Sequence, residues 1–238
     1  MQNKYEIKVR LRTSDFDTCG NIKPSSVLDL FQEAAGAHAV ELGCGFDDLV
    51  KKELLWVVTK VKYKVLKDVP MHCSVTVCTW PSKPSRVAFE REYKILDENG
   101  DTLIIGTSQW TIMHKEKRTL VLVNDIYPLS DFCEDKNFDE KLAKVPDFET
   151  ADFEREILPV YSELDRNGHV NNIRYADYVL NCIEPKDKKI CDFQIDFHRE
   201  IKKDVPVLVS AKQNDSVYLA KGTSNDGEKM FSAFIGVK

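Results

Sequence analysis

Residues 162–170 read Ser-Glu-Leu-Asp-Arg-Asn-Gly-His-Val, and residues 14–22 read Ser-Asp-Phe-Asp-Thr-Cys-Gly-Asn-Ile. The two stretches align without a gap: Ser14, Asp17 and Gly20 match Ser162, Asp165 and Gly168. Further along, Lys-Asp-Val-Pro occurs at 67–70 and again at 203–206. One short match can arise by chance, but two matches in the same order, each at the same place relative to a predicted helix, indicate an internal duplication. The chain is therefore predicted to fold as two similar units.

Each unit is expected to combine one long helix with long antiparallel strands. Alternating apolar residues predict strands at 5–11, 55–65, 87–95 and 103–113. In the second of these, the odd-numbered residues from Leu55 to Val65 are predicted to share one face. Asn99-Gly100 suits a tight turn between the last two strands.

Apolar residues at helical spacing predict helices over 24–43 and 171–183. Pro24 suits the first turn of one helix, Gly43 its end, and Pro185 the end of the other. A sheet that curls around a helix and buries the helix's apolar stripe gives an α+β fold. The expected organisation is an N-terminal unit over 1–123, a linker with some short helix over 124–158, and a C-terminal unit over 159–238.

Composition narrows the class of protein. With 238 residues, 42% of them hydrophobic and 31% charged, the chain can bury a core without disulfides. Seven cysteines, an odd number without a Cys-x-x-Cys pair, favour a reducing compartment. No signal segment and no membrane-spanning run is visible, so a cytoplasmic protein without a membrane partner is expected. A net charge of −5 argues against nucleic acid as a partner.

The two matching turns differ where chemistry would be done. The first turn carries Cys19 and Asn21, whereas the second carries Asn167 and His169 at the equivalent positions. For an isolated motif, turn formation and capping would be sufficient explanations. They do not explain why the polar groups are concentrated in one of two equivalent turns, so the second turn is the candidate active site.

The residue types in the second turn suit the hydrolysis of a thioester. His169 can exchange protons near neutral pH, and a carboxylate such as Asp165 can set its tautomer. The helix that follows is expected to direct free N–H groups and its positive dipole end at the site. Such donors, with Asn167, would stabilise negative charge on the carbonyl oxygen. A second carboxylate is expected from a strand over 193–200.

These residues resemble a known family, the fatty acyl-ACP thioesterases of plants and their bacterial relatives. Residues 165–175, Asp-Arg-Asn-Gly-His-Val-Asn-Asn-Ile-Arg-Tyr, are similar to its D-x-N-x-H-V-N-N-x-x-Y segment, and His-Arg-Glu at 198–200 to its Y-R-R-E strand. Leu-Trp-Val-Val-Thr at 55–59 and Thr-Ser-Gln-Trp at 107–110 resemble its first-half motifs. The resemblance covers nearly the whole chain. It implies a double hotdog fold, hydrolysis of long- or medium-chain acyl-ACP to free fatty acid, and no metal or organic cofactor.

Carried over residue by residue, the resemblance assigns four catalytic residues: Asp165, Asn167, His169 and Glu200. The plant pattern has a cysteine directly after the glutamate, and Ile201 stands there in this chain. A cysteine nucleophile at that position is therefore excluded. Either carboxylate can activate water or attack directly, with His169 handling the proton.

Alternatives stay open on the same fold. They are an acyl-CoA thioesterase, a hydratase that pairs histidine with a carboxylate, and a protein that binds acyl thioesters without catalysis. Acyl carrier protein is acidic, so basic side chains are expected around the site; the candidates are Arg166, Arg174, Lys202 and Lys203. A homodimer is one possible assembly. His38, on the apolar stripe of the first helix, is expected to be a satisfied core histidine.

Overall fold

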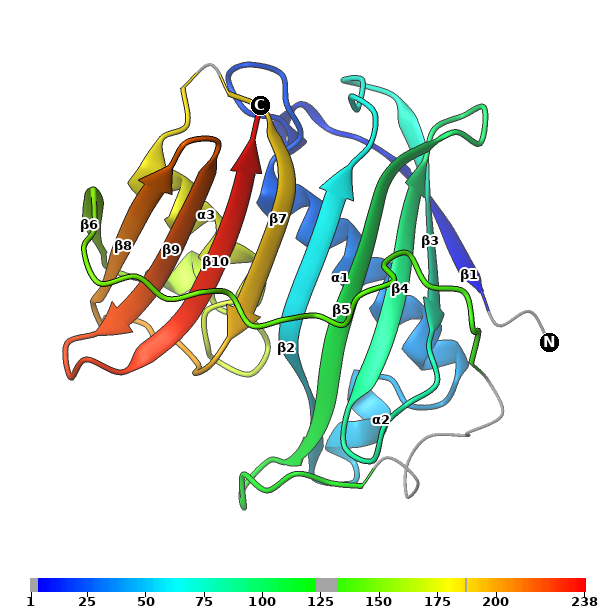
Figure 1. The fold of residues 1–238 in the computed structure, drawn as a ribbon. Helices are drawn as coiled ribbons and strands as arrows, with labels where there is room; N and C mark the ends of the chain where they lie inside the picture. Colours follow the sequence, from blue (N-terminus) through cyan, green and yellow to red (C-terminus); the bar gives the residue numbers. More distant parts are fainter. Residues whose placement is uncertain (1–3, 123–131, 187) are drawn as a thin grey trace. The chain divides into compact units, whose positions relative to one another are not determined.

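The computed structural model describes residues 4–122, 132–186 and 188–238 (Figure 1). These residues form two compact units. The first comprises Met1–Asp15 and Asp29–Lys141, and the second comprises Phe16–Leu28 and Leu142–Lys238. Each unit is dominated by antiparallel strands with few helices, which confirms the predicted α+β class.

The elements are long strands and short to medium helices. The strands are β1 (Tyr5–Arg10), β2 (Leu54–Val65), β3 (Ser74–Pro81), β4 (Phe89–Leu96), β5 (Thr102–His114), β6 (Phe153–Ile157), β7 (Ile190–Phe197), β8 (Val207–Asn214), β9 (Val217–Ser224) and β10 (Lys229–Val237). The helices are α1 (Pro24–Glu41), α2 (Phe46–Val50) and α3 (Asn172–Ile183), with single 3-10 turns at Thr13–Asp15 and Tyr161–Glu163. The predicted strands and helices are confirmed to within a few residues. None of the helices in the described part of the chain has the length and apolar character needed to cross a membrane.

In the first unit the strands pair in the order β1-β3-β4-β5-β2, all antiparallel. Phe31 of α1 stacks on Tyr93 of β4 with ring centroids 4.2 Å apart. A Cβ at Gly106 of β5 would lie 2.3 Å from the Phe31 ring. The close approach of helix and sheet therefore requires glycine at this position.

A β-bulge in β2 changes which residues face the core. The pairing of β2 with β5 shifts register between Val58 and Lys60. Val58 is buried before the bulge, and Val61 and Tyr63 are buried after it. Because a bulge inserts one extra residue, the alternation changes phase, so that Leu54 and Val58 are buried before it and Val61 and Tyr63 after it; Leu55, at the start of the strand, is buried as well. The prediction of a single odd-numbered face from Leu55 onward is therefore wrong for the first part of the strand.

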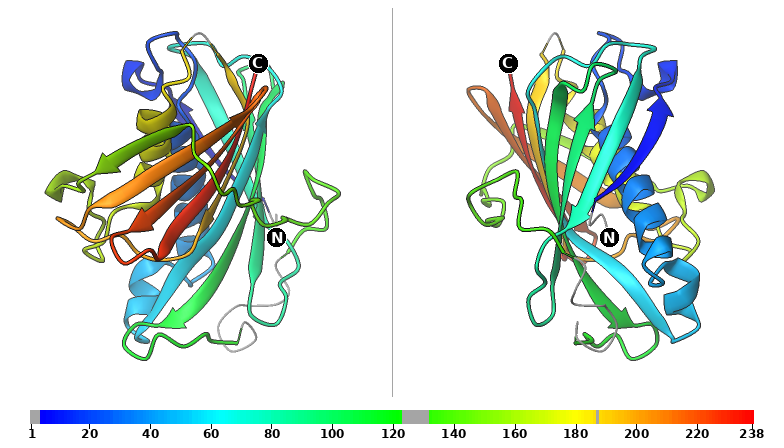
Figure 2. Two further views of the ribbon diagram at one scale, coloured as in Figure 1. Left: turned by 60° about the vertical axis from the view of Figure 1, so that its left-hand side comes forward. Right: turned by 90° about the vertical axis from the view of Figure 1, so that its right-hand side faces the viewer.

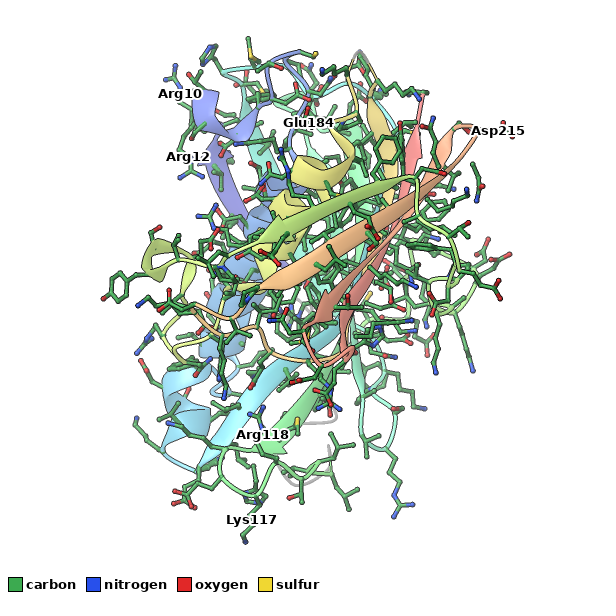
Figure 3. The ribbon with its side chains drawn as sticks, turned by 90° about the vertical axis from the view of Figure 1, so that its left-hand side faces the viewer. Arg10, Arg12, Lys117, Arg118, Glu184 and Asp215 are labelled. Carbon is green, nitrogen blue, oxygen red and sulfur yellow. The ribbon has the colours of Figure 1, made fainter. Side chains whose placement is uncertain are left out.

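In the second unit the strands pair in the order β7-β10-β9-β8-β6, again antiparallel. Helix α3 lies against β6 and β8 (Figure 2). The helix ends at Ile183 and is capped by Glu184, whose backbone is left-handed with φ of 39° and which Pro185 follows (Figure 3). Asp215, also left-handed with φ of 50°, makes the tight turn between β8 and β9 (Figure 3).

The predicted linker contains a strand. Residues 123–131 lie outside the described part, and 132–152 form neither helix nor strand, so the short helix predicted in the linker is absent from this described stretch. Phe153–Ile157 form β6, which pairs with β8. Val145 precedes β6, and its N–H donates to the buried carboxylate of Asp196 in β7 at 3.0 Å. The segment before β6 is thus tied to the sheet of the second unit, and the boundaries at 123 and 158 stay predictions.

Candidate active site

The segment that carries the predicted site is a tight, hydrogen-bonded turn. The Asp165 N–H donates to the His169 carbonyl at 2.8 Å, and the Gly168 N–H donates to the Asp165 carbonyl at 3.1 Å. Gly168 has a φ of +79°, a conformation that side chains disfavour. The Oδ1 atom of Asp165 accepts from the N–H groups of Asn167 at 2.8 Å and His169 at 3.3 Å. Asp165 therefore shapes the turn from within.

The matching turn of the first repeat has the same geometry. The Asp17 N–H donates to the Asn21 carbonyl at 2.8 Å, and Gly20 has a φ of +77°. The Oδ1 atom of Asp17 accepts from the N–H groups of Cys19 at 2.8 Å and Asn21 at 2.9 Å. Isolated antiparallel bridges flank both turns at equivalent positions. This confirms the repeat predicted from the sequence, at the level of individual hydrogen bonds.

The two turns differ in what their last side chain meets. The Nε2 atom of His169 lies 3.3 Å from Oε2 of Glu200. Both side chains are partly buried, with exposed fractions of 26% and 35%. A histidine and a carboxylate 31 positions apart in the chain are thus brought into contact, and both remain partly exposed.

Glu200 is positioned by a loop and not by a strand. The sequence predicted a strand over 193–200, but β7 ends at Phe197. The residue after Glu200 is fixed on both sides, because the Ile201 N–H donates to the Tyr175 hydroxyl at 2.9 Å and its carbonyl accepts from the Val170 N–H at 2.9 Å. Ile201 itself is 1% exposed. The loop is therefore anchored directly beside the carboxylate that contacts His169.

Asn167 is the most exposed member of the predicted set. Its side-chain amide donates to Oδ2 of Asp165 at 3.4 Å. An amide carries two hydrogens, so the second can donate to a substrate oxygen. Both carboxylate oxygens of Asp165, in contrast, already accept hydrogen bonds inside the turn.

The backbone N–H groups before α3 are already used. The Val170 N–H donates to the Ile201 carbonyl, and the Asn171 N–H donates to the Glu163 carbonyl at 2.8 Å. The Asn171 side chain caps the helix by accepting from the Ile173 N–H at 3.2 Å. The expectation of free N–H groups here is therefore wrong for these three positions, because the Ile201 carbonyl, the Glu163 carbonyl and the Asn171 side chain accept their hydrogen bonds. The positive end of the helix dipole still lies beside the turn.

The four basic candidates lie in different surroundings. Arg166 and Lys202 are exposed. Arg174 contacts Asp177 at 3.2 Å, and Lys203 contacts Asp204 at 2.9 Å. Arg174 and Lys203 therefore have acidic partners within the chain.

His38 is a core histidine, as predicted. It is 4% exposed and stacks on Tyr5, and its Nδ1 lies 3.0 Å from Nη1 of Arg91. Burial, assisted by the charge of Arg91, lowers the pKa of His38 from 6.5 to about 4. In the part of the chain that the structure describes, no group of three or more His, Cys, Asp or Glu side chains is arranged to hold a metal ion.

Tyr175 contacts the loop that carries Glu200, and the sequence did not predict this contact. Its hydroxyl contacts both neighbours of Glu200, since it also donates to the Arg199 carbonyl at 3.4 Å. The signal was present as the final tyrosine of the 165–175 segment. On the buried face of α3, however, the sequence cannot distinguish a tyrosine that holds a loop from one that only fills the core.

Comparison with solved structures defines the class of protein. The fold matches an acyl-ACP thioesterase from Bacteroides thetaiotaomicron with a TM-score of 0.89, 19% identity, and coverage of 99% of this chain and 98% of that one. It also matches the 12:0-ACP thioesterase of Umbellularia californica with a TM-score of 0.85, 20% identity, and coverage of 100% and 98%. The protein is therefore a double hotdog protein, which confirms the predicted fold.

Sequence comparison identifies the family. The acyl-ACP thioesterase N-terminal domain matches residues 2–128, and the acyl-ACP thioesterase C-terminal domain matches residues 148–235. The chloroplastic acyl-ACP hydrolase FATB3 of Cuphea viscosissima is 30% identical over 217 residues, which cover 84% of this chain and 50% of that protein. The chloroplastic palmitoyl-ACP thioesterase of Arabidopsis thaliana is 32% identical over 200 residues, covering 75% and 48%. The chain belongs to the acyl-ACP thioesterase family, and it spans about half the length of the curated relatives it matches.

Proposed function

We propose that the protein hydrolyses fatty acyl-ACP to free fatty acid and acyl carrier protein, and so ends or adjusts fatty acid synthesis. The observation that carries this proposal is the contact between His169 and Glu200, which lie 3.3 Å apart. The equivalent turn of the first repeat has Asn21 in place of His169. Relatives named as acyl-ACP hydrolases support the choice of carrier. The first unit is assigned the acyl chain and the second the chemistry.

In this proposal the two carboxylates have different tasks. Both oxygens of Asp165 accept hydrogen bonds within the turn, so this residue holds the turn in shape. Glu200 faces the imidazole of His169 and is the carboxylate that acts with it. Glu200 receives this task because one of its carboxylate oxygens faces Nε2 of His169.

The reaction adds water across the carbonyl carbon–sulfur bond. His169 accepts a proton from the attacking water, while Glu200 stabilises the imidazolium that forms. The second hydrogen of the Asn167 amide donates to the carbonyl oxygen as it becomes negative. The carbon–sulfur bond then breaks, and His169 returns the proton to the leaving sulfur of the carrier.

No cysteine is assigned a part in this reaction. The position after Glu200 is Ile201, whose side chain is buried and carries no thiol. All seven cysteines are free thiols, which supports the proposal of a cytoplasmic, reducing environment. A homodimer stays a prediction.

The test is release of free thiol from acyl-ACP and acyl-CoA substrates of varied chain length. His169→Ala should lower kcat by at least 100-fold without unfolding the protein, because the side chain is partly exposed and supports only the chemistry (roughly the contribution of a general acid–base residue). Asn21→Ala changes the equivalent position of the other turn and is the matched control, expected to keep near-normal turnover. Equal loss in both variants would move catalysis out of the second turn. Hydrolysis of acyl-CoA alone would replace the proposed carrier, and binding without hydrolysis would indicate a sensor.

A further inference from the structure

One buried side chain contacts the backbone on both sides of Glu200. The Tyr175 hydroxyl accepts from the Ile201 N–H at 2.9 Å and donates to the Arg199 carbonyl at 3.4 Å. These two peptide groups lie immediately before and after Glu200. We infer that Tyr175 is a positioning residue, which fixes the backbone on both sides of Glu200 and so holds its carboxylate against His169.

The tyrosine is itself rigid. Its ring is 1% exposed and packs edge-on against Phe197 at 5.5 Å and obliquely against Phe231 at 5.4 Å. Tyr178, one turn further along α3, stacks on it with the ring planes 7° apart. Burial raises the pKa of Tyr175, so the hydroxyl stays protonated and keeps its donor. A locked ring with a permanent O–H can impose a fixed geometry on the loop.

Hydrogen bonds also connect the loop of Glu200 to the segment that carries His169. Ile201, bonded to Tyr175 through its N–H, accepts from the Val170 N–H through its carbonyl at 2.9 Å. Val170 directly follows His169 in the chain. Tyr175 and Val170 thus tie the segment after Glu200 to the segment after His169, and these contacts lie on each side of the two side chains that approach to 3.3 Å.

The alternative is that the Tyr175 hydroxyl is merely a buried group with satisfied hydrogen bonds. The same helix provides a control for this. Tyr178 is 2% exposed, and its hydroxyl donates to Oε2 of Glu163 at 2.8 Å. Removing either hydroxyl leaves the ring in place and takes away a buried hydrogen bond, but only Tyr175 contacts the loop of Glu200.

The inference rests on the proposed function, and the first experiment compares Tyr175→Phe with Tyr178→Phe in acyl-ACP hydrolysis. Tyr175→Phe should lower kcat roughly 10- to 100-fold with KM within about threefold of wild type, because misplacing a reacting group by about 1 Å has effects of this size. Tyr178→Phe should keep kcat within about threefold. Equal losses in the two variants, or a change in KM alone, would overturn the inference.

The second experiment asks whether Tyr175 acts through Glu200. In a Glu200→Gln background the additional change Tyr175→Phe should alter kcat by less than about twofold, since residues that act as one unit are not additive. A full second loss in that background would mean that Tyr175 acts elsewhere. If Glu200→Gln turns over too slowly to follow, the decision falls to the comparison of the two tyrosine variants together with the next measurement.

A third measurement does not need activity. Hydrogen exchange at the Ile201 amide, followed by NMR, should accelerate at least tenfold in Tyr175→Phe and stay unchanged in Tyr178→Phe, because only the first change removes its acceptor. Unchanged exchange in Tyr175→Phe overturns the anchor whether or not the enzyme is active. If exchange at Ile201 is faster in Tyr175→Phe but the wild-type protein hydrolyses no thioester, the positioning role of Tyr175 stands and the proposed function is rejected.

Discussion

Two histidines of this chain lie in contrasting environments. His38 is buried, and its Nδ1 lies 3.0 Å from the Nη1 of Arg91, a permanent donor. His169 is partly exposed and faces the carboxylate of Glu200. Burial beside a permanent cation keeps the imidazole of His38 neutral in the first environment. In the second, a carboxylate oxygen of Glu200 lies 3.3 Å from Nε2 of His169. Only the second suits a residue that must gain and lose a proton during turnover.

The environment of His38 predicts a pH-dependent stability. Its pKa is about 4 in the folded protein and 6.5 in the unfolded chain, so below pH 6.5 the unfolded state binds a proton that the folded state does not. The stabilisation present above pH 6.5 is therefore lost as pH falls towards 4, amounting to about 2 kcal/mol at pH 5. Urea unfolding at pH 7 and pH 5 should show this loss in the wild type and a smaller one in His38→Asn, whose amide oxygen can still accept from Arg91. The same pH dependence in both proteins would contradict the assignment.

At this scale the sequence predicted which side chains lie together better than how they are held in place. Asp165, Asn167 and His169 are close in the chain, so one turn brings them together. Glu200 was found through a family resemblance, and its loop geometry depends on Tyr175, a long-range contact that no local pattern encodes. The structural task of Asp165 could not be predicted, since a carboxylate that shapes a turn and one that activates water have the same sequence.

Among the elements, the two matching turns allow a comparison within one molecule. Gly168→Ala and Gly20→Ala each place a side chain at a φ near +78°, where no neighbour clashes at Gly168 and only the backbone is strained. Each change should destabilise the protein by about 1–2 kcal/mol. The expected kcat falls several-fold for Gly168→Ala, which displaces His169, and stays near normal for Gly20→Ala. Thermal unfolding and steady-state kinetics check both; a similar kinetic loss at Gly20 would show that the turns are functionally coupled.

Periodicity predicted the long elements and failed at two short-range irregularities. Helices α1 and α3 and strands β1, β4 and β5 have apolar residues at regular spacing, and the structure has them where expected. The bulge in β2 arises from its pairing with β5, which the sequence of one strand does not specify. Strand β6 reads Phe-Glu-Arg-Glu-Ile, too short and too charged to stand out, and exists because β8 offers an edge to pair with.

For the molecule as a whole, the repeat predicted two units, but not how residues divide between them. Phe16–Leu28, including the first matching turn, groups with the second unit. A boundary drawn at one position in the chain cannot describe such an exchange. The information lies in contacts between residues far apart in sequence, which neither composition nor a short repeat contains.

Charged side chains on the surface are expected to affect the binding of acyl carrier protein. Reversing Arg166, Arg174, Lys202 and Lys203 together to glutamate should raise KM for acyl-ACP far more than for acyl-CoA, because acyl carrier protein is acidic. Exposed charges act weakly and are screened, so the wild-type preference for acyl-ACP should decline with added salt. The control reverses four other exposed lysines and changes the net charge equally: Lys8, Lys52, Lys115 and Lys117. Equal KM increases in the two variants would mean a general charge effect, and no increase in either would place docking elsewhere.

Cys19 occupies the position in the first turn that Asn167 occupies in the second, and it is the exposed one among the seven cysteines. A dye that traps the thiol of the released carrier will therefore also label the enzyme itself, at the turn of the first repeat. The background should approach one equivalent per chain and should appear before substrate is added. Cys19→Ser should remove this signal and leave turnover unchanged, which makes it the suitable starting form for colorimetric assays of this protein.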